Sequence, residues 1–306
     1  MGVEAEKARI AVVGAGLMGH GIAQVFALAG HEVTITDSVV ASLDSAKARI
    51  LTNLKDLGED QSVVDRVMPH VNLADAVANA DYVVEAVLED LDLKQKLFGE
   101  IERVVRPDAI LASNTSVIPI TQIMGGLQRR ERALGTHWWN PPYLVPLVEV
   151  IGTEWTSQRT IDSTIKLHAE AGKTPVHVKK DVPGFVGNRL QHALWRECIA
   201  LVQNGICDAE TVDTVIKASF GRRLAVLGPL ENADLVGTDL TLAIHRTVLP
   251  DLDRTPGPSP YLEGLVANGK LGMKAGEGFR TWTPEQQSAL RARVLQHLKR
   301  ARESNA

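Results

Sequence analysis

Residues 8–37, ARIAVVGAGLMGHGIAQVFALAGHEVTITD, decide the fold of the N-terminal part of this chain. The segment opens with apolar, β-branched residues that run into a glycine turn, which predicts a buried strand over residues 8–15. Residues 20–30 predict a helix that stops at a glycine, and residues 31–37 predict a second short strand. Together they form a β-α-β unit, the building block of a parallel sheet.

Strand and helix patterns continue to alternate up to about residue 180. A charged helical stretch runs from Ser42 to Val67, and residues 93–105, LKQKLFGEIERVV, are also helical in pattern. The strand-like segments are DYVVEAV (81–87), AILASNTS (109–116), RALGTHWW (132–139), LVEVI (147–151) and TPVHVKK (174–180). This alternation predicts an α/β fold of the Rossmann type, a doubly wound and mostly parallel sheet with helices on both faces.

Beyond Val182 the pattern changes to helices only. The helical segments are residues 188–205 with a glycine stop, residues 208–221 with Asp208 as N-cap, and an amphipathic stretch over 285–303. Residues 253–260, DRTPGPSP, are a stiff polar connection. We therefore expect a Rossmann domain in residues 1–182 and a smaller all-α C-terminal domain in residues 183–306, with the boundary near VPGF.

The composition excludes several classes of function. The net charge of −4 comes from 33 basic and 37 acidic residues without charged blocks, so nucleic acid is not an expected partner. No apolar run is long enough for a membrane span, and the N-terminus leads directly into a strand without a signal peptide, so we expect a cytoplasmic protein. Cys198 and Cys207 lack the spacing of a metal site or a disulfide framework.

The glycine turn predicts a dinucleotide site. Residues 14–19 match the G-x-G-x-x-G pattern between a strand and a helix; the expected cofactor-binding residues here are Gly14, Gly16, Leu17, Met18 and Gly19. The start of the helix offers unpaired amides and partial positive charge to phosphates. Asp37 ends the second strand, where an acid accepts hydrogen bonds from the adenosine ribose and repels a 2′-phosphate, which favours NAD over NADP. FAD, and a glycine turn used only for packing, are the alternatives.

A second site is predicted around GTHWWNPPYLVPLVEV, residues 135–150. Glu149 stands alone in an apolar strand, and a buried carboxylate needs a partner. His137 ends a neighbouring strand at the sheet edge where doubly wound folds bind ligands, and histidine suits a general base near neutral pH. With Glu149 facing it, the imidazole would be fixed in one tautomer and stabilised when protonated. The alternative is an ordinary hydrogen-bonded histidine.

Several motifs in one register resemble the L-3-hydroxyacyl-CoA dehydrogenase family over nearly the whole chain. They are GAGLMGHGIAQVFA (14–27), ADYVVEAVLEDLDLKQKLF (80–98), SNTS (113–116), HWWNPPYLVPLVEVI (137–151), KKDVPGFVGNRL (179–190) and GKLGMKAGEGF (269–279). The resemblance implies an NAD-binding N-terminal domain, a helical C-terminal domain for substrate binding and dimerisation, and a homodimer. It also implies oxidation of a secondary alcohol by hydride transfer to NAD.

The resemblance also assigns individual residues. His137 and Glu149 occupy the family's catalytic positions, and Ser116 matches the serine that contacts the reacting oxygen of the substrate. Asn140 and Asn188 match asparagines that orient the substrate and the nicotinamide, with a turn or a helix cap as the alternative. The remaining expected cofactor residues are Asn114, Glu89 and Lys94. Glu89 and Lys94 match positions near the nicotinamide ribose, but as exposed charges they would equally suit a solvated helix start.

Three features depart from the acyl-CoA members. The stretch from Ser42 to Val67 is slightly acidic where those members carry lysines for CoA phosphates, and Trp138-Trp139 replace two phenylalanines, either narrowing the pocket or serving as core residues. Arg222 and Arg223 could bind a substrate carboxylate or be solvated. We expect NAD-dependent oxidation of a 3-hydroxy acid or its acyl-CoA ester, with a substrate without CoA preferred, as in relatives acting on gulonate, carnitine or a pyridine-carboxylate alcohol. The alternative is a non-catalytic, crystallin-like or NADH-binding relative.

Overall fold

The structure, a computed structural model, describes residues 7–304 of the chain. It divides into two compact units. One contains the residues up to Arg189 together with those from Gln296 onward, and the other is Leu190–Leu295. The division lies a few residues beyond the expected boundary at 182–185, inside helix α7, and the end of helix α12 belongs to the first unit.

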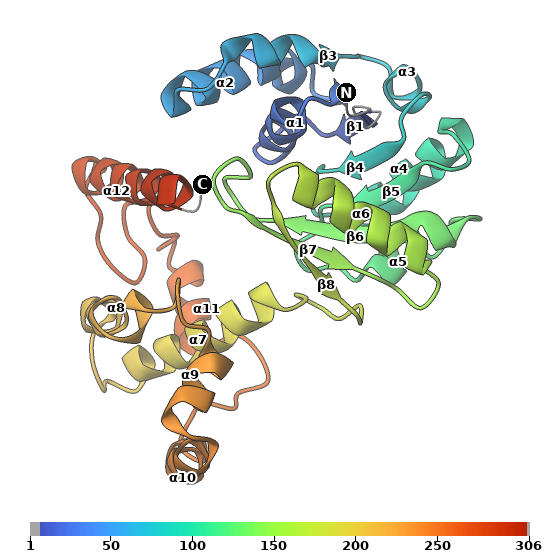
Figure 1. Ribbon diagram of the computed structural model, residues 1–306. Helices are drawn as coiled ribbons and strands as arrows, with labels where there is room; N and C mark the ends of the chain where they lie inside the picture. The colour runs from blue at the N-terminus through green and yellow to red at the C-terminus, as the bar shows by residue number, and fades with distance from the viewer. Residues whose placement is uncertain (1–6, 305–306) are drawn as a thin grey trace. The chain divides into compact units, whose positions relative to one another are not determined.

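The first unit is built on one eight-stranded sheet (Figure 1). Its strands are β1 (Arg9–Val13), β2 (Glu32–Thr36), β3 (Val67–Pro69), β4 (Tyr82–Glu85), β5 (Ile110–Ser113), β6 (Ala133–Trp138), β7 (Leu147–Ile151) and β8 (Thr174–Val178). They lie in the order β3-β2-β1-β4-β5-β6-β7-β8, and every neighbouring pair is parallel except β6 with β7. The mostly parallel, doubly wound sheet is confirmed. Its strand order reverses between β1 and β4, which is where such sheets bind ligands.

Helices cover both faces of this sheet. They are α1 (Gly19–Leu28), α2 (Val40–Leu57), α3 (Leu73–Val77), α4 (Leu91–Val104), α5 (Ile120–Met124) and α6 (Gln158–Glu170). Side chains alternate along each strand, so Ile10 and Val12 join one core with α1, α2 and α6. Ala11 and Val13 join a second core with α3, α4 and α5. Both faces are buried, which explains why the strands are nearly continuous apolar runs.

The helical prediction from Ser42 to Val67 was only partly right. Helix α2 ends at Leu57, and Gly58 after it takes the left-handed conformation (φ 69°) that suits a glycine C-cap. A 3₁₀ helix, η1 (Gln61–Arg66), and the edge strand β3 then complete the stretch. Strand β3 has only three residues, and two of them are exposed, so it lacks the buried apolar pattern that marks the other strands.

The second unit is helical, as predicted. Its elements are α7 (Gly187–Gln203), α8 (Ala209–Ala218), η3 (Phe220–Arg222), α9 (Pro229–Val236), α10 (Thr238–Val248), α11 (Pro260–Ala267) and α12 (Pro284–Ser304), of which α7 and α12 also extend into the first unit. Asp208 caps α8 as expected, because its Oδ1 accepts the Thr211 amide hydrogen at 2.7 Å. Within residues 7–304 no helix combines the length and the apolarity that crossing a membrane requires.

Candidate active site

The glycine loop joins β1 to α1 and is shaped by close backbone approach. Gly14 has φ +106°, and a Cβ added there would lie 2.5 Å from the carbonyl oxygen of Ala86. A Cβ on Gly19 would lie 1.7 Å from the carbonyl oxygen of Gly14. At Gly16, in contrast, a Cβ would meet no atom within 4 Å, so this residue faces open space. The three glycines thus take the roles of a tight turn, helix packing and access for a ligand.

A cavity of about 690 Å³ lies over this loop, at the carboxyl ends of β1, β2 and β4. Eight of the ten residues expected to bind the cofactor or the reacting oxygen line it: Gly14, Gly16, Leu17, Met18, Asp37, Glu89, Asn114 and Ser116; Gly19 and Lys94 do not. The amides of Gly16, Leu17 and Met18 have no hydrogen-bond partner within the described residues. Unpaired amides at the N-terminus of α1 fit the pyrophosphate of a dinucleotide.

Asp37 lies at the end of β2, at the cavity wall. Its Oδ2 accepts the amide hydrogen of Ala15 at 2.6 Å, and its Oδ1 accepts that of Val39 at 2.8 Å. Each carboxylate oxygen has a second lone pair, so both remain able to accept ribose hydroxyl hydrogens. The two amides hold the carboxylate in place, which fits the predicted role at the adenosine ribose.

Lys94 is not exposed, so that expectation was wrong. Its side chain is fully buried and its ammonium lies 2.6 Å from Glu85 Oε1 and 3.3 Å from Glu89 Oε2. Glu85, the last residue of β4, also accepts hydrogens from the Ser113 hydroxyl at 2.6 Å and the Val87 amide at 2.7 Å. The sequence prediction missed Glu85, although it stands alone in the apolar run YVVEAV (82–87) just as Glu149 does in LVEVI.

Glu89 connects this ion pair to the loop that carries Ser116. Its Oε1 accepts hydrogens from the Thr115 hydroxyl at 2.6 Å and from the amides of Ser116 at 2.8 Å and Val117 at 3.2 Å. Burial raises the pKa of Glu89, but these hydrogen bonds and the charge of Lys94 outweigh it and lower the pKa overall. Glu89 therefore stays ionised, with Oε2 turned to Lys94.

Asn114 links the cavity to strand β6, and Asn188 links helix α7 to Ser116. Asn114 Oδ1 accepts the amide hydrogen of Trp138, the residue after His137, at 2.9 Å. Asn188, in the first turn of α7, donates from Nδ2 to the carbonyl oxygen of Ser116 at 2.9 Å. Ser116 itself is exposed and lines the cavity. The structure thus brings Ser116, Asn114 and Asn188 together through the ends of β5, β6 and α7.

His137 and Glu149 are in contact, as predicted. They face each other across the antiparallel pair β6 and β7, and His137 Nδ1 lies 2.7 Å from Glu149 Oε2. Both side chains are buried. A carboxylate can only accept, so Nδ1 carries the hydrogen and donates it, which leaves Nε2 as the proton acceptor. His137 is thus the partner that the buried carboxylate of Glu149 requires.

The other oxygen of Glu149 is held by the start of α7. Glu149 Oε1 accepts the amide hydrogens of Val186 at 2.9 Å and Gly187 at 3.0 Å. Burial raises the pKa of Glu149, but the hydrogen bonds from His137, Gly187 and Val186 outweigh it, and its pKa lies below the ordinary value. Glu149 is therefore an ionised, fully oriented partner for the imidazole.

The two tryptophans have different surroundings. Trp138 is almost fully buried and packs its ring against Phe26 and His168, so it is a core residue. The ring of Trp139 lies 5.3 Å from that of His137, centroid to centroid, and a Cβ on Gly187 would lie 2.4 Å from it. Trp139 therefore packs beside the imidazole and against Gly187, and its narrowing of a substrate pocket stays a prediction.

The other expected substrate residues are not part of these contacts. Asn140 is exposed, and its side chain has no hydrogen-bond partner within the described residues. Arg222 and Arg223 are exposed residues of the second unit, at η3, and their role at the substrate stays a prediction. Among residues 7–304 no group of three or more His, Cys, Asp or Glu side chains could hold a metal ion, and Cys198 and Cys207 are free thiols.

Comparison with known protein families agrees with this geometry. Residues 9–182 match the NAD-binding domain of 3-hydroxyacyl-CoA dehydrogenase, and residues 184–282 match its C-terminal domain. The chain belongs to the 3-hydroxyacyl-CoA dehydrogenase family. It is an NAD-dependent oxidoreductase that acts on a hydroxyl group, as the resemblance in the sequence implied.

The relatives include one enzyme named for a pyridine carboxylate and one named for a CoA ester. The chain is 37% identical over 288 residues to 5-formyl-3-hydroxy-2-methylpyridine 4-carboxylate 5-dehydrogenase of Mesorhizobium japonicum, covering 92% of this chain and 93% of that protein. It is 38% identical over 279 residues to a probable 3-hydroxybutyryl-CoA dehydrogenase of Deinococcus radiodurans, covering 89% and 99%. A crystal structure of the former type of enzyme, described as an NAD⁺-dependent dismutase, superposes with a TM-score of 0.90 at 35% identity and 97% coverage of each chain.

Proposed function

We propose that this protein oxidises the secondary hydroxyl of a small 3-hydroxy acid, with His137 as general base and Glu149 as the residue that orients it. The observation that carries the proposal is the 2.7 Å contact between His137 Nδ1 and Glu149 Oε2 in a buried site. Asn114 joins this pair to the wall of the glycine-loop cavity, because it binds the residue after His137.

The chemistry follows from the hydrogen bonds of the imidazole. Bound NAD supplies the hydride acceptor. His137 Nε2 accepts the hydroxyl proton of the substrate, because Nδ1–H is committed to Glu149. The ionised Glu149 stabilises the resulting imidazolium. We assign Ser116 to the reacting oxygen, and Asn140 and Asn188 to the orientation of substrate and nicotinamide.

We propose a substrate without CoA. The reason is that two basic residues of the stretch from Ser42 to Val67 already donate hydrogen bonds to backbone carbonyls of the protein. Arg49 donates to the carbonyl oxygens of Ala15, Gly16 and Ser42, and Arg66 donates to that of Ala27. The same stretch contains five acidic residues and two further basic residues. The acidic residues are Asp44, Asp56, Glu59, Asp60 and Asp65, and the basic residues are Lys47 and Lys55. This balance disfavours binding of the CoA phosphates. Arg222 and Arg223 are our candidates for binding a substrate carboxylate instead.

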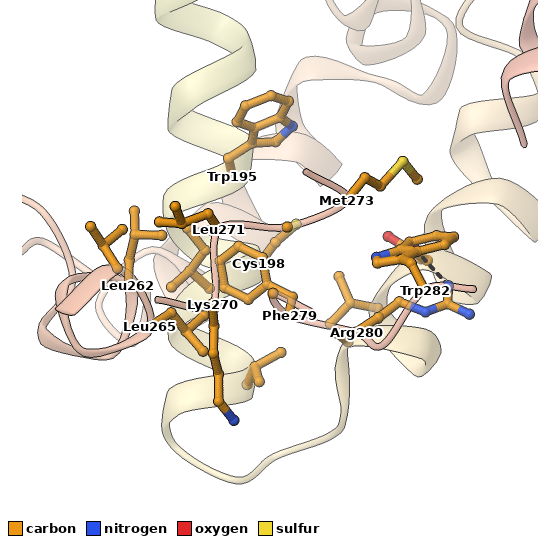
Figure 2. A pocket seen from close by; sticks show the side chains of 18 of the residues that line it. Trp195, Cys198, Leu262, Leu265, Lys270, Leu271, Met273, Phe279, Arg280 and Trp282 are labelled. Carbon is orange, nitrogen blue, oxygen red and sulfur yellow. Dashed lines mark hydrogen bonds and ion pairs between the residues drawn. The ribbon is translucent and has the colours of Figure 1, made fainter. Parts of the chain in front are cut away.

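We further propose a homodimer formed through the helical unit. In Leu190–Leu295 only Ala200 and Val212 are buried apolar residues, while Val226, Leu230 and Leu235 are 86%, 82% and 73% exposed. A unit of this size normally buries far more of its apolar surface. A cavity of about 600 Å³ between α7, α8 and α11 is also lined mainly by apolar side chains, among them Trp195, Leu271 and Phe279 (Figure 2).

A second copy covering this surface would supply the missing burial. Light scattering should then give twice the chain mass of 33.2 kDa. A monomer at micromolar concentration would contradict the dimer. The cytoplasmic location and the division into an NAD-binding domain (residues 1–182) and a substrate and dimerisation domain (residues 183–306) remain part of this proposal.

One assay tests the proposed substrate class. NADH release is compared for 3-hydroxybutyryl-CoA, free 3-hydroxybutyrate, carnitine, gulonate and a pyridine-carboxylate alcohol. We expect a higher kcat/KM with one of the free acids than with the CoA ester. A higher value with the ester would overturn the preference for a substrate without CoA. NADH binding without turnover of any of them would instead support the non-catalytic alternative.

A further inference from the structure

Arg49 connects helix α2 to the glycine loop. Its Nη2 donates to the carbonyl oxygens of Ala15 at 2.5 Å and Ser42 at 2.8 Å, and its Nη1 donates to that of Gly16 at 3.1 Å. The guanidinium therefore binds two consecutive peptide groups of the loop and anchors them to the first turn of its own helix. Arg49 does not line the cavity over the loop.

These two carbonyls belong to the peptide groups that carry the free amides of the loop. The Ala15 carbonyl shares its peptide plane with the Gly16 amide, and the Gly16 carbonyl shares its plane with the Leu17 amide. A trans peptide is rigid, and its C=O and N–H point in opposite directions. Holding both oxygens at Arg49 therefore fixes the direction of both N–H groups, which lack partners within residues 7–304.

The contacts also change the strength of these amides as donors. A hydrogen bond to a carbonyl polarises its peptide group, so the N–H on the same group becomes a better donor. The effect is larger when the donor to the carbonyl is a cation. The positive charge of Arg49, held at the carbonyl side of these two peptide groups, also favours an anion bound at their amide side.

His20 lies at the same position but does not replace the guanidinium. Its Nδ1 is 2.7 Å from the Gly16 carbonyl oxygen and 3.1 Å from Arg49 Nη1. Burial lowers the pKa of His20, and the charge of Arg49 adds to this, although the hydrogen bond to Gly16 raises it. The imidazole is therefore neutral at pH 7, and the positive charge at these carbonyls comes from Arg49.

We propose that Arg49 is a positioning residue for the cofactor, which orients and polarises the Gly16 and Leu17 amides toward the pyrophosphate of NAD without contacting it. The inference rests on the proposed cofactor site at the glycine loop. It predicts that loss of the guanidinium weakens the binding of any ligand that contains this pyrophosphate, while the reacting groups at His137 are unchanged.

The test is direct binding of NADH and ADP-ribose to the full chain, by fluorescence and calorimetry, for the wild type, Arg49→Gln, Arg49→Lys and Lys47→Gln. Lys47 is a matched control, because it is on the same helix and makes no hydrogen bond or ion pair within the described residues. Because the two amides lose their fixed direction and polarisation, we expect the Kd of Arg49→Gln for both ligands to rise about tenfold, which is about 1.4 kcal/mol. Arg49→Lys keeps the charge but not the planar fork, and should give an intermediate Kd.

Two further readouts separate positioning from a general structural effect. With saturating NAD, kcat of Arg49→Gln should stay within about twofold of the wild type while KM for NAD rises. An NADH affinity of Arg49→Gln equal to that of the wild type, or a loss no larger than that of Lys47→Gln, would overturn the inference. If Arg49→Gln does not fold, wild-type NADH affinity of Arg49→Lys would overturn it. Failure of the wild type itself to bind NADH would count against the proposed cofactor site instead.

Discussion

His137 and Glu149 are opposite each other on neighbouring antiparallel strands, and a 2.7 Å hydrogen bond joins their side chains. The pairing register itself therefore brings acid and base together. Strand β7 is antiparallel to β6, so the loop between them reverses the direction of the chain. Strand β7 then pairs with the C-terminal residues of β6. Within residues 7–304, β6 and β7 are the one antiparallel pair of the sheet, and this pair builds the candidate catalytic site.

The first prediction concerns His137. We expect His137→Gln to lower kcat by about a hundredfold or more, the usual contribution of a general base, with NADH affinity within about threefold of the wild type. Steady-state kinetics and NADH fluorescence titration measure the two effects. His245→Gln, which changes an exposed histidine of α10, is the control and should leave kcat unaltered. Unchanged kcat in His137→Gln would remove the assignment of the base.

The second prediction concerns Glu149. In Glu149→Gln the amide would donate to His137 Nδ1, which forces the hydrogen onto Nε2 and blocks the proton acceptor. We expect kcat to fall about a hundredfold or more while NADH binding stays close to the wild type. Glu154→Gln, at an exposed acid, is the matched control. A large loss of unfolding free energy that accounts for the lost activity would instead make Glu149 a structural carboxylate.

The third prediction concerns the pH dependence of stability. His168 is fully buried among the rings of Phe26, Tyr82 and Trp138, and burial lowers its pKa to about 4. In the unfolded state His168 binds a proton near pH 6.5, whereas in the folded state it does so only near pH 4. The stability that the neutral imidazole contributes is therefore fully present above pH 6.5 and is lost as the pH falls from 6.5 toward 4. Between pH 7 and pH 5 the loss from His168 is about 2 kcal/mol.

Urea unfolding at pH 7 and pH 5 measures this contribution. His168→Met has no titrating group, so its unfolding free energy should fall by about 2 kcal/mol less than that of the wild type over the same interval. Other buried histidines, such as His20 and His31, contribute equally to both proteins and cancel in the comparison. Equal pH dependence of wild type and variant would show that His168 is protonated in the folded state as easily as in the unfolded one.

The fold and the catalytic pair were predictable because their signals are local. The glycine motif between strand and helix marks the loop, and a lone acid in an apolar strand marks Glu149. Glu85 has the same signature and could have been found in the same way. Strand β3 could not, since it has three residues of which two are exposed.

Arg49 and Lys94 show the limit of reasoning from pattern. Each is a charged residue on an amphipathic helix, which normally points to solvent. The partners that hold them, the Ala15 carbonyl and Glu85, are 34 and 9 residues away in the chain. Only the packing of α2 and α4 against the carboxyl edge of the sheet brings these groups within hydrogen-bond distance, and no spacing in the sequence encodes that contact.

The fourth prediction compares two glycines of one motif. A Cβ at Gly19 would lie 1.7 Å from the backbone oxygen of Gly14, which cannot move without distorting the loop, so Gly19→Ala should lose about 3 kcal/mol of unfolding free energy or fail to fold.

A Cβ at Gly16 meets nothing within 4 Å, so Gly16→Ala should keep the wild-type Tm within about 2 °C. The space that the new methyl group occupies is the space proposed for the pyrophosphate. NADH affinity of Gly16→Ala should therefore fall about tenfold or more, measured by fluorescence titration. Wild-type affinity in a folded Gly16→Ala protein would mean that the dinucleotide does not approach the loop at this residue.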